Sequence, residues 1–148
     1  MIVFRLAKAA FTALDGEGAR LYGGRWNSVG RPMIYSSAGP SLAVLEIIVH
    51  LDLPLELIPD DYRLLTIAIP DDAPVERLEI LPTDPTPCAA LGDGFLDRNQ
   101  ALTLSVPSVV VPQDRNVLIN VRHPAMAAVQ IVGDEPFGFD PRLFGAAD

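Results

Sequence analysis

The sequence predicts a single α+β domain, with mixed or antiparallel sheets of short strands and a few helices. Two observations favour this class over a doubly wound parallel sheet. Many short apolar stretches are separated by prolines and polar turns, and they do not alternate regularly with helical stretches. A chain of 148 residues is also the size of one domain and can bury a core, so we assign residues 1–148 to it.

Most of the expected elements are strands. They are predicted, in order, at residues 2–6, 33–36, 62–70, 75–81, 105–111, 116–120 and 128–132. Pro70 is expected to end the third strand, because proline cannot donate a hydrogen bond to a neighbouring strand. Gly133–Pro136 is expected to turn the chain after the last one. The proline-rich connector Asp71–Pro87 is predicted to be solvent-exposed, with a mobile flap or a partner-facing surface as the alternatives.

The first expected helix carries a charge in an unusual position. It opens near Pro40, and Leu42, Leu45 and Val49 form its apolar stripe. Glu46 falls on the same side of this helix. A carboxylate on an apolar face is costly unless a partner or a ligand uses it. Glu46 therefore either faces a ligand, or reaches water or an arginine at the flank of the helix.

A second helix is expected in the middle of residues 91–104. The polar run Asp97–Gln100 is expected to be exposed, and a helical turn is expected at His123–Met126. The positions predicted to be buried are Phe95, Leu96, Ala101 and Leu102.

The overall composition limits the classes of function. A net charge of −8 argues against non-specific nucleic-acid binding, and no apolar run is long enough to span a membrane. We recognise no signal peptide, and the single Cys88 cannot form an internal disulfide, so a cytoplasmic location is expected. His50 and His123 are far apart in the sequence and no cysteine cluster accompanies them, so no metal site is predicted.

Several well-known catalytic motifs are missing from the sequence. It has no phosphate-binding loop of the G-x-x-x-x-G-K-[ST] type. The run Gly16–Gly18 lacks the third glycine and the preceding strand of a Rossmann fingerprint, so NAD is not expected as a redox cofactor. A hydrolase triad could be drawn from Ser108, His123 and Asp114, but no nucleophile elbow supports it.

The N-terminal quarter differs in charge from the rest. Residues 1–31 carry a net charge of +3, so the remaining residues carry −11. Glycines in this quarter let the backbone approach a ligand closely. The guanidinium groups of Arg20, Arg25 and Arg31 match phosphate oxygens two at a time. The next strand carries Tyr35, so this region predicts an anion site beside an aromatic ring.

The order of these pieces resembles the RES-domain toxins of bacterial type II toxin–antitoxin (Xre–RES) systems. The resemblance covers nearly the whole chain and rests on the ordered combination of its motifs. One departure is Val121, where the family pattern has a proline, close to Asn120. The matching residues are Arg5, Gly23-Gly24-Arg25-Trp26-Asn27, Gly30, Ile34-Tyr35-Ser36-Ser37, Leu42-Ala43-Val44-Leu45-Glu46, His50, Val106–Val111 and Asn116–Asn120.

The resemblance implies a fold similar to the ADP-ribosyltransferases and an activity that degrades NAD. Breaking the nicotinamide–ribose bond develops positive charge on the ribose, which a carboxylate such as that of Glu46 stabilises. His50, four residues later, is either a residue that orients Glu46 or one that flanks the helix end. The implied catalytic residues are Glu46, Arg25 and Tyr35, and the implied NAD-binding residues are Arg5, Arg25, Tyr35, Ser108 and Asn116, with Arg20 as a weaker choice.

We therefore expect a toxin that releases nicotinamide from NAD as a glycohydrolase or a phosphorylase, with NAD as substrate and no cofactor. A protein ADP-ribosyltransferase is the nearest alternative, because water, phosphate or a protein side chain could accept the ribose. A non-catalytic module that binds a nucleotide or a protein is the alternative from another class. The resemblance also implies a helix-turn-helix (Xre-type) antitoxin as partner, a homodimer within that complex, and no direct contact with nucleic acid or membrane.

Overall fold

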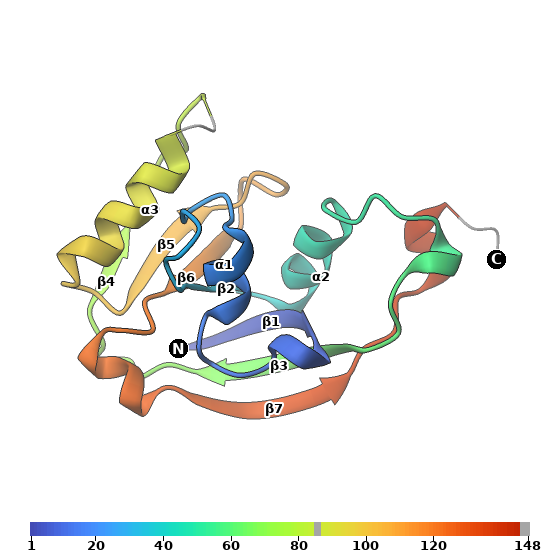
Figure 1. Ribbon diagram of the computed structural model, residues 1–148, viewed down its shortest axis with the longest axis horizontal. Coiled ribbons are helices and arrows are strands. Elements are labelled where there is room, and N and C mark those ends of the chain that lie inside the picture. Colours follow the sequence, from blue (N-terminus) through green and yellow to red (C-terminus); the bar gives the residue numbers. More distant parts are fainter. Residues whose placement is uncertain (85–86, 146–148) are drawn as a thin grey trace.

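Seven strands form one mixed sheet in the computed structural model, which describes residues 1–84 and 87–145. Their order is β4-β5-β6-β2-β1-β3-β7 (Figure 1). The pair β4–β5 is parallel and all other neighbours are antiparallel, which confirms the predicted α+β class. The strands are β1 Ile2–Lys8, β2 Ile34–Ser37, β3 Tyr62–Ala68, β4 Val75–Arg77, β5 Thr103–Pro107, β6 Arg115–Ile119 and β7 Gln130–Pro136.

Within the described residues, three α-helices accompany the sheet: α1 Glu17–Tyr22, α2 Pro40–Ile48 and α3 Pro87–Arg98. Helix α1, which the sequence did not predict, starts after Gly16 and ends at Gly23, and both glycines have a positive φ. Helix α3 starts and ends earlier than predicted, so Ala101 and Leu102 lie beyond it. The same part of the chain contains the short 3-10 helices η1 Ala9–Phe11, η2 Leu55–Leu57, η3 Pro124–Ala128 and η4 Pro141–Phe144.

The sheet opens between β1 and β2. Strand β1 pairs with β3 along its whole length, from Ile2–Ala68 to Lys8–Tyr62, but it pairs with β2 at Phe4–Ser37. In Figure 1, β1, β3 and β7 run in a different direction from β5 and β6 of the other half. Helix α2 packs next to β1 and β2, so it lies beside this β1–β2 junction.

Two hydrophobic clusters stabilise the fold. Successive side chains of a strand point to opposite faces, and on β6 the residues Val117 and Ile119 enter one cluster whereas Leu118 enters the other. The second cluster contains Trp26 and joins the loop after α1 to α3. Phe95, Ala101 and Leu102 are buried as predicted, and Leu96 is partly buried.

Three local predictions from the sequence were wrong. Gly133–Pro136 does not turn the chain, because these residues continue β7 and pair with β3 up to Arg63–Pro136. Strand β5 ends at Pro107, so Ser108–Val111 is not part of it. On α2, Leu42 is buried but Val49 is 54% exposed, since the helix ends at Ile48 and leaves Val49 outside the packed stripe.

A proline-rich connector joins β3 to α3. The connector Asp71–Pro87 contains β4, and residues 85 and 86 within it lie outside the described residues. In the ranges 1–84 and 87–145, no helix has the length and hydrophobicity needed to cross a membrane.

Candidate active site

A cleft of about 830 Å³ opens at the β1–β2 junction. This volume lies in the range of small-molecule sites in proteins. Its walls come from β1 and η1, from α1 and the loop that follows it, from β2, from α2, and from the segments around β5 and β6. Among the described residues that line it, three are cationic and one, Glu46, is acidic. The cleft is therefore locally basic in a protein whose net charge is −8.

Glu46 on α2 is held in the cleft by two neutral donors. The Ser108 hydroxyl donates to its Oε1 at 2.6 Å, and the Asn116 side-chain amide donates to the same oxygen at 2.8 Å. No ion pair within the described part of the chain involves Glu46. For the described residues, the alternative in which this carboxylate pairs with an arginine is therefore wrong.

Ser108 and Asn116 are themselves fixed. Ser108 is fully buried, and its hydroxyl accepts hydrogen bonds from the backbone N–H groups of Val110 and Val111 at 3.0 Å each. The Asn116 side-chain oxygen accepts from the Ser37 hydroxyl at 2.7 Å. Because Ser108 has no exposed surface, it can act on a ligand only through Glu46, whereas Asn116 lines the cleft.

Arg5 spans the β1–β2 junction. One of its guanidinium N–H groups donates to the backbone carbonyl of Tyr35 at 3.0 Å, and the side chain lines the cleft. Burial lowers the pKa of Arg5 from its ordinary value, and the negative charge of Asp15 opposes this shift. Arg5 therefore holds the two halves of the sheet together and presents a positive charge to the cleft.

The three arginines of the loop after α1 differ in their surroundings. Arg20 pairs with Glu17, and Arg31 pairs with Asp97. Neither of these two lines the cleft. Arg25 is exposed, lines the cleft, and makes no hydrogen bond or ion pair with the residues that the structure describes. Of the three, Arg25 is the one whose guanidinium is available to an anionic ligand.

Tyr35 connects the cleft to this loop. Its hydroxyl donates to the Asn27 side-chain oxygen at 2.6 Å and accepts from the backbone N–H of Trp26 at 2.9 Å. Burial raises the pKa of Tyr35 above its ordinary value, although the hydrogen bond from Trp26 acts in the opposite direction. A Cβ on Gly24 would lie 2.6 Å from the Tyr35 hydroxyl, so this close approach requires glycine. The Tyr35 hydroxyl thus anchors the loop while its ring lines the cleft.

Asn27 holds the loop together, a role that the sequence did not predict. It is 2% exposed, and its amide donates to the backbone carbonyls of Ala19, Ser28 and Arg31. Together with the bond from Tyr35, these contacts close the loop that presents Arg25. The G-G-R-W-N run indicates a loop in which an asparagine could bind backbone groups, but the partners of Asn27 cannot be read from the run itself.

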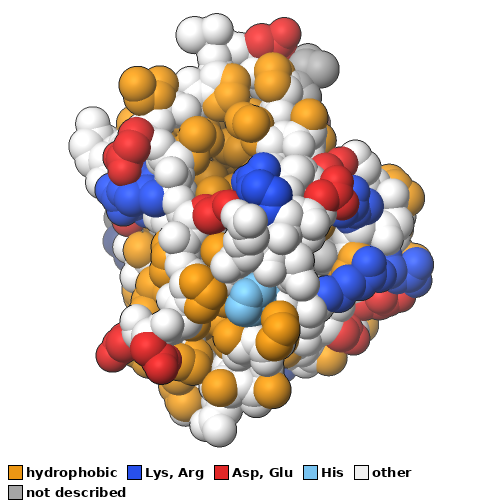
Figure 2. Space-filling model, turned by 90° about the vertical axis from the view of Figure 1, so that its left-hand side faces the viewer, with side chains coloured by type: hydrophobic (Ala, Val, Ile, Leu, Met, Phe, Trp, Pro, Cys, Tyr) orange, Lys and Arg blue, Asp and Glu red, His pale blue; other side chains and the backbone are white. Residues whose placement is uncertain are grey.

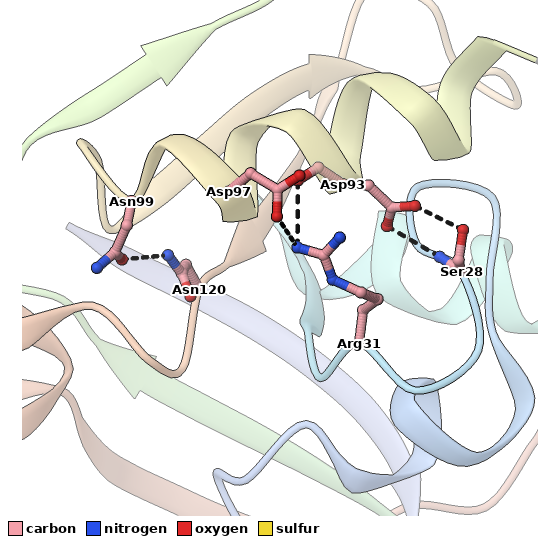
Figure 3. A network of polar contacts seen from close by, with 6 residues as sticks. All are labelled: Ser28, Arg31, Asp93, Asp97, Asn99 and Asn120. Atoms are coloured by element: carbon pink, nitrogen blue, oxygen red, sulfur yellow. Dashed lines mark hydrogen bonds and ion pairs between the residues drawn. The ribbon is translucent and has the colours of Figure 1, made fainter.

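Helix α3 holds the same loop from outside (Figure 3). The Asp93 carboxylate accepts from the backbone and the hydroxyl of Ser28, and Asp97 accepts from Arg31. At the end of the helix, the Asn120 amide donates to the Asn99 side chain at 2.7 Å. The loop near Asn120 is therefore held by this bond, with valine at the position where the family pattern has proline.

Two other features lie outside this arrangement. His50 is exposed and lines the cleft, but no hydrogen bond joins it to Glu46 within residues 1–84 and 87–145. A second hollow of about 300 Å³ lies between α3 and β4, where hydrophobic side chains gather at the top of the face in Figure 2. Its acidic residue, Glu76, pairs with Arg98, so it offers no free carboxylate.

Comparison with known proteins first defines the fold. A chain in the crystal structure of the M. tuberculosis MbcT–MbcA toxin–antitoxin complex superimposes with a TM-score of 0.75. The match covers 97% of this chain and 86% of that chain, at 23% sequence identity. The fold is therefore shared with a chain of that complex.

The sequence then defines the family. The RES domain model matches residues 2–140, and the chain belongs to the RES domain family, among the RES toxins. A protein of Pseudomonas putida named Toxin Res is 38% identical over 148 residues, which cover 97% of this chain and 100% of that protein. Toxin Res of Photorhabdus laumondii is 37% identical, with 99% of each chain covered. A Sphingobium protein named Prs ADP-ribosylating toxin is 34% identical and covers 90% of this chain and 88% of its own length.

Proposed function

We propose that this RES toxin cleaves NAD between nicotinamide and ribose. The observation that carries the proposal is the state of Glu46: its carboxylate is fixed by Ser108 and Asn116, carries no ion pair, and lies in a cleft whose other charged side chains are cationic. A dinucleotide matches this distribution, because it has an anionic pyrophosphate and a ribose that becomes positive during bond cleavage.

The chemistry follows from these positions. As the bond between ribose C1′ and the pyridinium nitrogen breaks, nicotinamide leaves with the electron pair, and positive charge develops on the ribose ring. The oriented Glu46 carboxylate stabilises that charge, as carboxylates do in glycoside cleavage. Arg5 and Arg25 bind the pyrophosphate, and the Tyr35 ring provides a surface for the nicotinamide. When water is the acceptor, its oxygen bonds to C1′ and one proton is released.

The alternative activities differ in the group that accepts the ribose after nicotinamide leaves. Water gives a glycohydrolase, phosphate gives a phosphorylase, and a protein side chain gives an ADP-ribosyltransferase. The name of the Sphingobium relative, Prs ADP-ribosylating toxin, favours the third alternative for that protein, so it is kept here as the second candidate function.

We also propose a cognate antitoxin as the partner of this chain. The support is the similarity to relatives named Toxin Res and to a chain of a solved toxin–antitoxin complex. An antitoxin of the Xre type, a toxin homodimer within the complex and a cytoplasmic location complete this proposal. Co-expression tests it: the chain alone should arrest growth of its host, and the gene for the antitoxin should restore growth.

Nicotinamide release by the purified protein is the direct test. Wild type should release nicotinamide from NAD, and Glu46→Gln should reduce kcat about a hundredfold or more, because it removes an oriented charge and keeps the shape. Glu56→Gln, at an exposed position outside the cleft, is the matched control and should behave as wild type. If Glu46→Gln released nicotinamide at the wild-type rate, Glu46 would not be the catalytic carboxylate.

Two further measurements separate the alternatives. If NAD is consumed only when a target protein is added, and the target gains the mass of ADP-ribose, the chain is an ADP-ribosyltransferase. If NAD raises the melting temperature and no nicotinamide appears with water, phosphate or cell extract, the chain is a binding module.

A further inference from the structure

The end of the cleft beyond the arginines is aromatic. Phe11 of η1 and Tyr22 of α1 both line the cleft, and their rings meet edge to face with centroids 6.4 Å apart. Phe11 is half-buried, whereas Tyr22 is 75% exposed. The α1 backbone supports this pair, since the Cβ position of Gly18 lies 3.4 Å from the Phe11 ring. The mechanism proposed above gives neither ring a role.

Two chain segments lead from the arginines to this pair. On one side, β1 continues from Arg5 to Lys8 and then into η1, which carries Phe11. On the other side, the loop runs back from Arg25 to Tyr22 over three residues. Residues 5–8 and 22–25 all line the cleft, so both segments form cleft wall between the pair and the arginines that would bind a pyrophosphate.

The register of β1 places this pair away from the reacting bond. Phe4 pairs with Ser37, whose hydroxyl binds Asn116, and Asn116 binds Glu46. Phe4 therefore lies at the end of the cleft that contains the Glu46 carboxylate. Lys8 lies four residues further along the same strand face, a span of about 13 Å at the rise of an extended chain. An extended dinucleotide with its nicotinamide ribose at Glu46 would place its adenosine at the other end.

Lys8 gives this end a positive charge. It is the only lysine of the chain, it is exposed, and it lines the cleft. It has no ion pair with any residue in the described part of the chain. An aromatic surface beside an unpaired cation suits a nucleobase attached to a phosphate, because bases stack on aromatic rings and phosphates bind ammonium groups.

We infer that Phe11 and Tyr22 form the adenine subsite of the cleft, with Lys8 at its phosphate side. The inference rests on the proposed function, since it assigns the half of NAD that does not react. It makes the aromatic pair a determinant of substrate specificity: dinucleotides are preferred over nicotinamide mononucleotide, which contains the same reacting bond but no adenylate.

The test compares these two substrates with one exposed substitution. Wild type should have a higher kcat/KM for NAD than for nicotinamide mononucleotide. Tyr22→Ala should reduce the ratio of the two values about tenfold, the loss expected for one base–ring stacking contact. Tyr22→Phe keeps the ring and should retain the wild-type ratio. Leu21→Ala, an exposed neighbour outside the cleft, is the matched control.

Each possible result either supports or overturns the adenine subsite. A wild type that cleaves both substrates equally well, or a Tyr22→Ala variant with the wild-type ratio, overturns the inference and leaves the cleavage of NAD intact. If wild type cleaves neither substrate, the proposed function fails, and calorimetric titration with AMP decides the subsite separately. AMP should then bind wild type and Tyr22→Phe and bind Tyr22→Ala about tenfold more weakly. Equal AMP affinity in all three proteins, or no binding to any, overturns the inference.

Discussion

At the scale of single residues, the site depends on how Glu46 is held. Both of its hydrogen bonds arrive on Oε1, from Ser108 and Asn116, and a hydrogen bond to a charged group contributes about 1.5–3 kcal/mol. Removing either donor should therefore leave the carboxylate in the cleft but less well oriented. Because Ser108 is fully buried, it cannot contact a substrate directly, and its effect should appear in kcat.

We expect Ser108→Ala to reduce kcat for nicotinamide release about tenfold or more, with a much smaller change in KM. Steady-state kinetics with NAD measures both values. Ser41→Ala, an exposed serine at the start of α2, is the matched control and should leave both unchanged. A rise in KM without a fall in kcat would mean that Ser108 contributes to substrate binding and not to the orientation of Glu46.

Asn27 and Tyr35 should be coupled in stability. Asn27→Ala removes the acceptor of the Tyr35 hydroxyl proton and the donor to three backbone carbonyls, so it should lower the free energy of unfolding by about 2 kcal/mol or more. Tyr35→Phe removes the hydroxyl group that donates the hydrogen bond to Asn27. Urea unfolding of both single variants and the double variant should give a coupling energy of about 0.5–3 kcal/mol. Simple additivity would show that the two side chains act independently.

The sequence predicted some of these residues and missed others for a physical reason. Glu46 could be singled out because helical spacing places it among apolar residues, and the family resemblance then indicated a catalytic role. The role of Asn27 could not, because its partners Ala19 and Arg31 approach it only when the loop closes. In the same way, Arg20 and Arg25 look alike in sequence, and only the ion pair between Arg20 and Glu17 distinguishes them.

At the scale of elements, α3 determines the position of the loop that carries Arg25. Its Gly92 packs on the Trp26 carbonyl so closely that a Cβ would lie 1.7 Å from that oxygen. Gly94, two residues later, would place a Cβ 3.2 Å from the flexible end of Arg98. These two glycines share a helix but differ in what they contact, so they form a matched pair for mutation.

Gly92→Ala should destabilise the protein by about 1–3 kcal/mol or more, although alanine favours a helix, because α3 must move away from the loop. It should also lower kcat/KM for NAD, since the loop presents Arg25 to the cleft. Gly94→Ala should be neutral or stabilising by up to about 1 kcal/mol. Urea unfolding and nicotinamide release measure the two effects. Equal stability of the two variants would contradict the close packing of α3 on Trp26.

Element boundaries show where sequence patterns are weak. The strands β1, β3 and β6 were predicted because each contains a short group of apolar residues typical of a buried strand: Ile2–Phe4, Leu64–Leu65 and Val117–Ile119. Helix α1 was missed, since Glu17–Tyr22 has six residues and too few turns to show helical spacing. Gly133–Pro136 contains turn-forming residues, yet it extends β7 because Gly133 fits against Thr66 of β3, where a Cβ would lie 3.0 Å from the threonine hydroxyl. Such tertiary contacts are invisible in the local sequence.

At the scale of the whole molecule, the decisive feature is the opening of the sheet between β1 and β2. The sequence predicted the class of fold but not the order of the strands, because β1 pairs with β3, more than fifty residues away, and only briefly with β2. Arg5 crosses this β1–β2 junction to reach the Tyr35 carbonyl. The cleft thus draws one wall from each half of the sheet, and a ligand within it must contact both.

This arrangement predicts where a ligand should protect the backbone. Binding of ADP-ribose should slow amide hydrogen exchange in β1 and η1 on one side of the junction, and in residues 22–37 and α2 on the other. The edge strands β7 and β4 should change little, because neither lines the cleft. Arg25→Ala should weaken the protection on both sides together, since it lowers ligand affinity. Protection confined to one half of the sheet would mean that the ligand does not cross the junction, and the assignment of Arg5 and Arg25 to a single pyrophosphate would then be wrong.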